Sequence, residues 1–122
     1  MLAGDFFIIK DIHSGGNEAE AVLEINAEHE IFRGHFPRQP VVPGVCMMQI
    51  IKEILEKVLS KKTRLIRADH AKFLSMIDPR VNPMIKASLK YSIAENGEIE
   101  VISSLSHEST IFLKYRAVFV TA

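Results

Sequence analysis

One stretch of the chain holds residue types that could act on a carbonyl compound. Residues 34–44 read Gly-His-Phe-Pro-Arg-Gln-Pro-Val-Val-Pro-Gly. The prolines recur every three residues. Because proline fixes φ and lacks an N–H, the stretch favours a rigid irregular loop. The histidine on this loop, His35, can take up and release a proton near neutral pH. The stretch therefore predicts proton-transfer chemistry.

A helix must follow this loop, and its first turn would complete the site. Pro43 suits the first position of a helix, and after Gly44 no glycine or proline occurs until residue 79. Apolar residues cover most of the helix circumference up to about Leu59, so other structure should wrap around it. The free N–H of Gly44, aided by the helix dipole, is placed to hold a carbonyl oxygen that gains negative charge.

The remaining segments are expected to be strands. Apolar and polar residues alternate on both sides of turn signals at Ser14-Gly15-Gly16-Asn17 and Asn96-Gly97. The expected strands cover residues 5–12, 18–25, 64–74, 85–93, 99–105 and 111–119. The sequence therefore predicts an α+β fold with one long helix and a sheet of about five or six mainly antiparallel strands.

Length and composition narrow the class of protein. The 122 residues are expected to form one domain, residues 1–122, with a single core. With 15 basic and 15 acidic residues, the chain should bind neither nucleic acid nor a membrane surface. No apolar run approaches the roughly 20 residues of a membrane span. The single cysteine, Cys46, is expected to be a core residue and favours a reducing, cytoplasmic compartment.

The loop also resembles a known family signature. The run His35-Phe36-Pro37-x-x-Pro40-Val41-x-Pro43-Gly44-Val45 is similar to that of the β-hydroxyacyl-acyl-carrier-protein dehydratases of the hot-dog superfamily. The order of elements is similar across nearly the whole chain, including the segment from Lys72-Phe73 to Asp78-Pro79. The resemblance implies a hot-dog fold in which the sheet wraps the helix. It also implies protomers that pair into dimers or larger homo-oligomers, with acyl sites at the dimer interface.

The resemblance assigns roles to individual residues. The substrate would be a 3-hydroxyacyl thioester on an acyl carrier protein, with no cofactor and no metal. His35 would be the base and Gly44 the donor to the thioester oxygen. Phe36, Pro43 and Val45 would contact the substrate. Gln49 stands fourteen residues after the histidine, where the family has a catalytic carboxylate. Its amide can position the hydroxyl but has no readily transferable proton.

Glu53 and a set of basic residues leave alternatives open. Glu53 lies one turn beyond Gln49 on the same face, where it could replace the missing carboxylate or contact substrate. Its spacing equally predicts an ordinary i,i+4 ion pair with Lys57. Basic side chains after the helix are either solvated surface or contacts for an acidic carrier protein; they include Arg64, Arg67 and Lys72.

Three functions are consistent with these residues. The first is a 3-hydroxyacyl-carrier-protein dehydratase in fatty-acid or related lipid or polyketide biosynthesis. The second is a catalytically weak acyl-binding subunit that forms a heteromer with another hot-dog dehydratase. The third is an acyl thioesterase in which Glu53 activates water. A metal site at Glu28-His29-Glu30 is rejected, because adjacent residues of a strand point to opposite faces.

Overall fold

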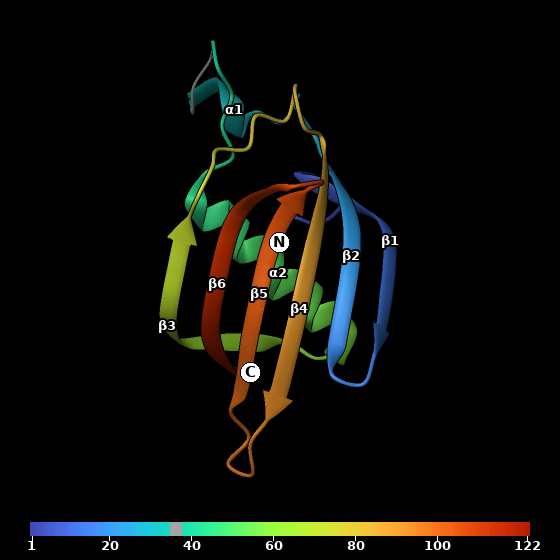
Figure 1. Cartoon of the computed structure of the whole chain (residues 1–122), viewed down its shortest axis with the longest axis vertical. Coiled ribbons are helices and arrows are strands. Elements are labelled where there is room, and N and C mark those ends of the chain that lie inside the picture. The colour runs from blue at the N-terminus through green and yellow to red at the C-terminus, as the bar shows by residue number, and fades with distance from the viewer. Residues whose placement is uncertain (35–37) are drawn as a thin grey trace.

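Six strands form one sheet in the order β1-β2-β4-β5-β6-β3, and every neighbouring pair is antiparallel. The computed structural model describes residues 1–34 and 38–122. The elements are β1 Phe7–Gly15, β2 Glu18–Ile25, α1 Ile31–Gly34, α2 Gly44–Leu59, β3 Thr63–Phe73, β4 Met84–Ile93, β5 Ile99–His107 and β6 Thr110–Thr121. Helix α2 lies behind the sheet and crosses its strands (Figure 1). The predicted α+β architecture is confirmed.

The hairpin turns follow the chemistry of their residues. Gly16 and Asn17 connect β1 to β2 with φ angles of 57° and 66°, which is the pattern of a two-residue type I′ turn. The turn predicted at Asn96-Gly97 is also present, but only Gly97 has a positive φ, 89°. The N–H of Gly97 donates to the carbonyl of Ala94 at 2.9 Å. The glycine therefore ends a longer loop instead of standing inside a two-residue turn.

Helix α2 is bounded by local signals at both ends. It starts after Pro43, whose φ is −60°, and stops at Ser60, whose φ of 55° is left-handed. Its inner side chains are fully buried and face the inward side chains of the sheet; they are Ile50, Ile51, Ile54 and Leu55. Burying each such side chain contributes about 1.5–3 kcal/mol. Within the described residues, no helix is both long and apolar enough to cross a membrane.

The short helix α1 was not expected from the sequence. Four residues are too few to show helical periodicity. Phe32 is its buried residue, and it packs against Phe6 with ring centroids 5.5 Å apart. Helix α1 is thereby attached to the chain's N-terminal region.

Strand β3 differs from the other strands because it is almost uncovered. It lies at one edge of the sheet, and after the buried Thr63 every residue of the strand is exposed. Three of the exposed side chains are large and apolar: Leu65, Ile66 and Phe73, with exposed fractions of 38–48%. An apolar edge strand is a ready template for pairing with another strand.

Candidate functional site

The N-terminus of α2 has unpaired backbone donors. Among residues 1–34 and 38–122, no side chain caps it. The N–H groups of Cys46 and Met47 both donate to the carbonyl of Pro43, at 3.0 and 3.1 Å. Neither Gly44 nor Val45 donates its N–H to an acceptor among residues 1–34 and 38–122. Two donors with the helix dipole behind them are therefore available to an anionic oxygen.

Gly44 is covered on one side by an aromatic ring from the end of β3. A Cβ added to Gly44 would lie 3.0 Å from Cζ of Phe73, closer than side chains normally pack. The Phe73 ring, itself 48% exposed, therefore rests on the glycine. The lack of a side chain at Gly44 thus makes room for this contact, and on that side the glycine is covered by Phe73.

Backbone hydrogen bonds fix the segment that leads into α2. The N–H of Val42 donates to the carbonyl of Ile77 at 3.0 Å, and that of Leu74 donates to Phe112 at 2.9 Å. Pro40 and Val41 are buried beside them. The start of α2 is thereby held against the segment after β3. His35 and Phe36 lie outside the described residues, so their roles stay predictions.

Gln49 is half-buried, and its amide has a defined orientation. Its Nε2 donates to Oε2 of Glu53 at 2.9 Å. An ionised carboxylate can only accept hydrogen bonds, so the amide must turn its nitrogen toward Glu53. No described residue donates to the carbonyl oxygen of Gln49, which is therefore an acceptor for a ligand such as a hydroxyl group.

Glu53 is buried, with 5% of its surface exposed, and it binds the N-terminal backbone. Its carboxylate accepts the N–H of Leu2 at 2.7 Å and that of Ala3 at 2.8 Å. The predicted ion pair with Lys57 is wrong, because the carboxylate points into the protein while Lys57 is exposed. Three hydrogen bonds leave Glu53 little capacity to activate a water molecule.

The ion pair on this part of the helix joins Glu56 to Lys52, at 3.5 Å. Glu56 also accepts the backbone N–H of Thr63 at 2.7 Å and its hydroxyl at 3.2 Å. Burial acts to raise the pKa of the Glu56 carboxyl, but the Thr63 hydrogen bonds and the Lys52 charge outweigh it. The net effect lowers the pKa, so Glu56 stays ionised and ties the helix end to β3.

His29 has a structural set of partners. Its Nε2 lies 3.0 Å from a carboxylate oxygen of Asp5, and its Nδ1 accepts the N–H of Ile31 at 3.1 Å. The ring meets that of Phe6 edge to face, with centroids 5.3 Å apart. In the described part of the chain, no three His, Cys, Asp or Glu side chains are grouped to hold a metal. His29 therefore caps α1.

Cys46 lies in the first turns of α2 but is not activated. It is buried, and burial raises the pKa of its thiol. A raised pKa keeps the sulfur protonated and weakly nucleophilic at neutral pH. Cys46 behaves as the small core residue predicted from the sequence.

The basic residues named from the sequence lie on β3, where Arg64, Arg67 and Lys72 are all exposed. Arg67 is engaged, because its guanidinium lies 2.9 Å from Asp69 and 3.9 Å from Glu98. Neither Arg64 nor Lys72 forms an ion pair with any described residue. The three side chains are therefore not equivalent as contacts for an acidic partner.

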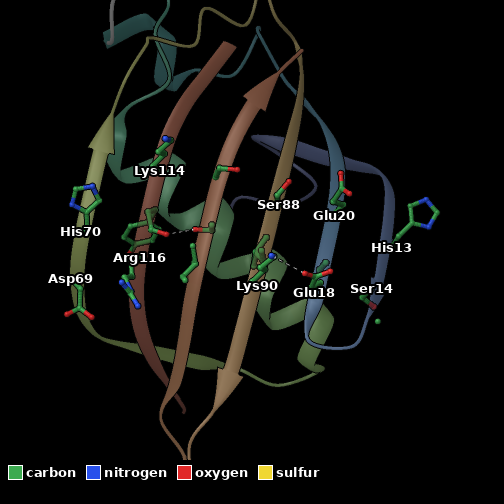
Figure 2. A pocket seen from close by; sticks show the side chains of 17 residues that line it. His13, Ser14, Glu18, Glu20, Asp69, His70, Ser88, Lys90, Lys114 and Arg116 are labelled. Carbon is green, nitrogen blue, oxygen red and sulfur yellow. Dashed lines mark hydrogen bonds and ion pairs between the residues drawn. The ribbon is translucent and has the colours of Figure 1, made fainter. Parts of the chain in front are cut away.

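A hollow on the surface of the sheet lies away from the helix N-terminus. It occupies about 1090 Å³ on the outer face of the sheet, opposite α2, and Figure 2 shows its polar side chains on the strands. A second hollow of about 380 Å³ lies beside the C-terminal half of α2 and includes Glu53. Neither hollow is lined by Gly44 or Gln49. The volume of a hollow therefore does not identify the site, since the unpaired N–H donors are at the start of α2.

Sequence comparison connects the chain to known proteins. Residues 11–107 match the model of the ApeI-like family, described as ApeI dehydratase. The 3-hydroxyacyl-acyl-carrier-protein dehydratase FabZ of Clostridium acetobutylicum is 31% identical over 71 residues, 52% of this chain and 50% of that protein. FabZ of Lactococcus lactis subsp. cremoris is 29% identical over 109 residues, 80% of this chain and 72% of that protein. The chain thus spans about half the length of the first relative.

Structural comparison agrees with the sequence match. A chain of the dehydratase heterocomplex ApeI:P from Xenorhabdus doucetiae superposes with a TM-score of 0.68 at 20% identity. The match covers 93% of this chain and 96% of that one. The predicted hot-dog fold is confirmed.

Several contacts at the site could not be read from the sequence. The partners of Glu53 are 50 and 51 residues away from it, and no local spacing signals such a bond. The ring of Phe73 over Gly44 joins two distant segments in the same way. For the unpaired N–H of Val45 the sequence held a weak signal, since the first N–H groups of any helix lack intrahelical acceptors.

Proposed function

We propose, from the premise that this chain belongs to the ApeI-like dehydratase family, that it binds 3-hydroxyacyl thioesters and removes water from them. The observation that carries the proposal is the uncapped start of α2, where the N–H groups of Gly44 and Val45 have no acceptor among the described residues. Pro43 and Val45 flank this position and would contact the acyl thioester.

The helix N-terminus supports the first step of the reaction. When the α-proton leaves, negative charge develops on the thioester oxygen, and preorganised N–H donors stabilise such charge. His35 would take the α-proton as the base. The electrons of the C–H bond then form the Cα=Cβ double bond, and the C–O bond at the β-carbon breaks.

Gln49 would hold the leaving hydroxyl. Its carbonyl oxygen would accept a hydrogen bond from the substrate hydroxyl. The lone pairs of the hydroxyl oxygen would then remain available for the proton that His35 returns. Water then departs, and the enoyl thioester remains. Glu53 would act through Gln49, because it fixes the orientation of the amide. Phe36 would contact the acyl chain, as its place in the family signature implies.

Partners and location complete the proposal. The acyl group would arrive on an acyl carrier protein, and the protein would work in the cytoplasm as a homo-oligomer. The uncovered apolar edge of β3 supports pairing between protomers. A site shared by two protomers also agrees with hollows that leave Gly44 unenclosed in a single chain.

A second candidate function is a binding subunit of a heteromeric dehydratase. It is favoured by one observation: Gln49 replaces the family carboxylate, and Glu53 is held by the N-terminal backbone. The partner subunit would then supply the proton donor. Hydrolysis of the thioester has less support. It requires Glu53 to activate water, but three hydrogen bonds already hold that carboxylate.

Turnover assays separate these functions. The purified protein is incubated with 3-hydroxyacyl and 2-enoyl thioesters, and dehydration, hydration and free thiol are followed. We expect interconversion of the two thioesters without thiol release, and loss of turnover in His35→Ala. If the His35→Ala variant were still active, His35 would not be the base.

Other outcomes support the alternatives. No turnover by the protein alone, together with stimulation of a partner dehydratase, would replace the first function with the subunit role. Thiol release without enoyl product would indicate a thioesterase.

A further inference from the structure

Four basic side chains lie together on the outer face of β6 and β3. Lys114 and Arg116 flank the buried Tyr115 on β6, so they project from the face opposite α2, as Figure 2 shows. The strand register places Lys72 opposite Lys114 and His70 opposite Arg116. We refer to these four residues as the basic patch.

No carboxylate of the described residues neutralises the charge of the basic patch. Like charges directly opposite each other on paired strands destabilise a sheet. Yet none of the four forms an ion pair with any carboxylate in residues 1–34 and 38–122. The adjacent acidic residue, Asp69, is bound by Arg67 at 2.9 Å. The unpaired positive charges of Lys72, Lys114 and Arg116 are therefore available to an anionic partner.

The acidic residues that line the hollow are already paired. Glu18 lies 3.4 Å from Lys90, and Glu20 lies 2.9 Å from Lys86. These pairs stand on β2 and β4, on the side of the hollow away from the basic patch. The hollow therefore offers unpaired positive charge at its β6–β3 side.

The basic patch lies next to the start of α2. Lys72 is followed in β3 by Phe73, whose ring would meet a Cβ on Gly44 at 3.0 Å. Lys72 and Phe73 are consecutive residues of β3, so the patch and the start of α2 are linked through one end of this strand. A partner there would therefore be close to the open N–H donors.

The shape of the hollow favours a convex protein surface. From β2 to β3 it spans four strand spacings, about 19 Å, and a helix with side chains is about 10–12 Å wide. Ile102, 54% exposed, lies on its floor. All four patch residues are exposed. Small anions instead bind where donors converge in a concave pocket.

We propose that the basic patch docks an acidic helix of the carrier protein that delivers the acyl thioester. This inference rests on the proposed function and names the docking surface for it. Lys114 and Arg116 supply the central contacts, with Lys72 and His70 beside them. Arg67 contributes little, because Asp69 already binds it.

Binding of a purified holo acyl carrier protein tests the docking surface. Lys114→Glu/Arg116→Glu is compared with wild type and with a control, Lys10→Glu/Lys86→Glu, on the β1 and β4 side of the sheet. Both double variants change the net charge equally, and circular dichroism checks that both fold. We expect the patch variant to bind at least about tenfold more weakly and the control to stay within about twofold. Wild-type binding should weaken with added salt.

Three outcomes would overturn the inference. Equal weakening in both variants would indicate attraction by overall charge, and unchanged binding in the patch variant would place the partner elsewhere. Free phosphopantetheine that displaces the carrier protein at equal concentration would make the patch a small-anion site.

A second substrate separates this inference from the proposed function. A 3-hydroxyacyl pantetheine thioester needs no carrier protein, so the patch variant should turn it over as wild type does. If wild type turns over neither substrate, the proposed function fails while the binding data still decide the docking surface.

Discussion

The contact between Gln49 and Glu53 is the most informative at the scale of single residues. Gln49 lacks a transferable proton, but the hydrogen bond to Glu53 orients its amide so that the carbonyl oxygen can act as an acceptor. The sequence predicted that Gln49 would position a hydroxyl, but it offered no means to orient the amide. That orientation depends on Glu53, whose own partners come from the N-terminus.

Gln49→Glu tests this contact through activity. Two carboxylates about 3 Å apart cannot both ionise, so one must keep a proton. Glu53 retains its two backbone donors, and we therefore expect the new glutamate to hold the proton and act as a general acid. Turnover should rise, by up to about a hundredfold, and should fall again at alkaline pH as this proton is lost. The measurement is kcat/KM against pH.

Gln49→Met is the matched control, since it keeps the side-chain length and removes the polar group. Equal rates for Gln49→Glu and Gln49→Met would contradict the role given to this position.

Glu56 provides a pH-dependent test of stability. Its pKa is lowered below the ordinary value of 4.5, so the folded state binds this proton less tightly than the unfolded state does. The stabilisation is therefore complete above the unfolded pKa and is lost as the pH falls through the folded pKa. We expect Glu56→Gln to cost about 1–2 kcal/mol at pH 7, with the difference disappearing in acid. Urea denaturation at several pH values measures it.

Glu100→Gln is the control for that experiment, because Glu100 is exposed and forms no ion pair among the described residues. A cost for Glu56→Gln that persists undiminished in acid would show that ionisation is not its cause.

Two histidine–aspartate pairs of similar length allow the contribution of a buried pair to stability to be compared with that of an exposed pair. His29 and His13 lie 3.0 and 2.9 Å from their carboxylates, but their side chains are 16% and 79% exposed. We expect His29→Ala to cost about 2 kcal/mol, because it removes a helix cap and an aromatic contact. His13→Ala should cost less than about 0.5 kcal/mol. Similar unfolding free energies for the two variants would contradict the capping role.

At the scale of elements, the sequence predicted which segments are helices and strands better than it predicted which of them lie side by side. The apolar periodicity of α2 and the alternation in the strands extend over many residues, so both were recognisable. The short helix α1 was missed because one turn shows no period. The exposure of β3 could not be foreseen either, since its edge position depends on pairing with β6, far along the chain.

The apolar edge of β3 predicts the oligomeric state. If protomers pair through this strand, Ile66→Lys should yield monomers, because a buried lysine lacks a partner. Ile102→Lys on the outer face of β5 is the control, since Ile102 is 54% exposed and Ile66 is 39% exposed. Light scattering measures the molar mass. Dimers that survive Ile66→Lys but not Ile102→Lys would place the interface on the other surface.

At the scale of the whole molecule, one sheet places the functional elements. The start of α2, the end of β3 and the basic patch meet at one edge, although they come from three separate parts of the chain. The family signature predicted the first of these from adjacent residues alone. The other two depend on cross-strand register, which no local pattern in the sequence reveals.

The pairing of β3 with β6 also constrains the order of folding. Thr63 pairs with Thr121, and the segments of β4 and β5 lie between these two strands in the sequence. During synthesis, β3 therefore leaves the ribosome well before its partner exists. Such non-local pairing slows folding and exposes an unpaired apolar strand to aggregation. The nascent chain should accordingly need protection by chaperones until β6 has emerged.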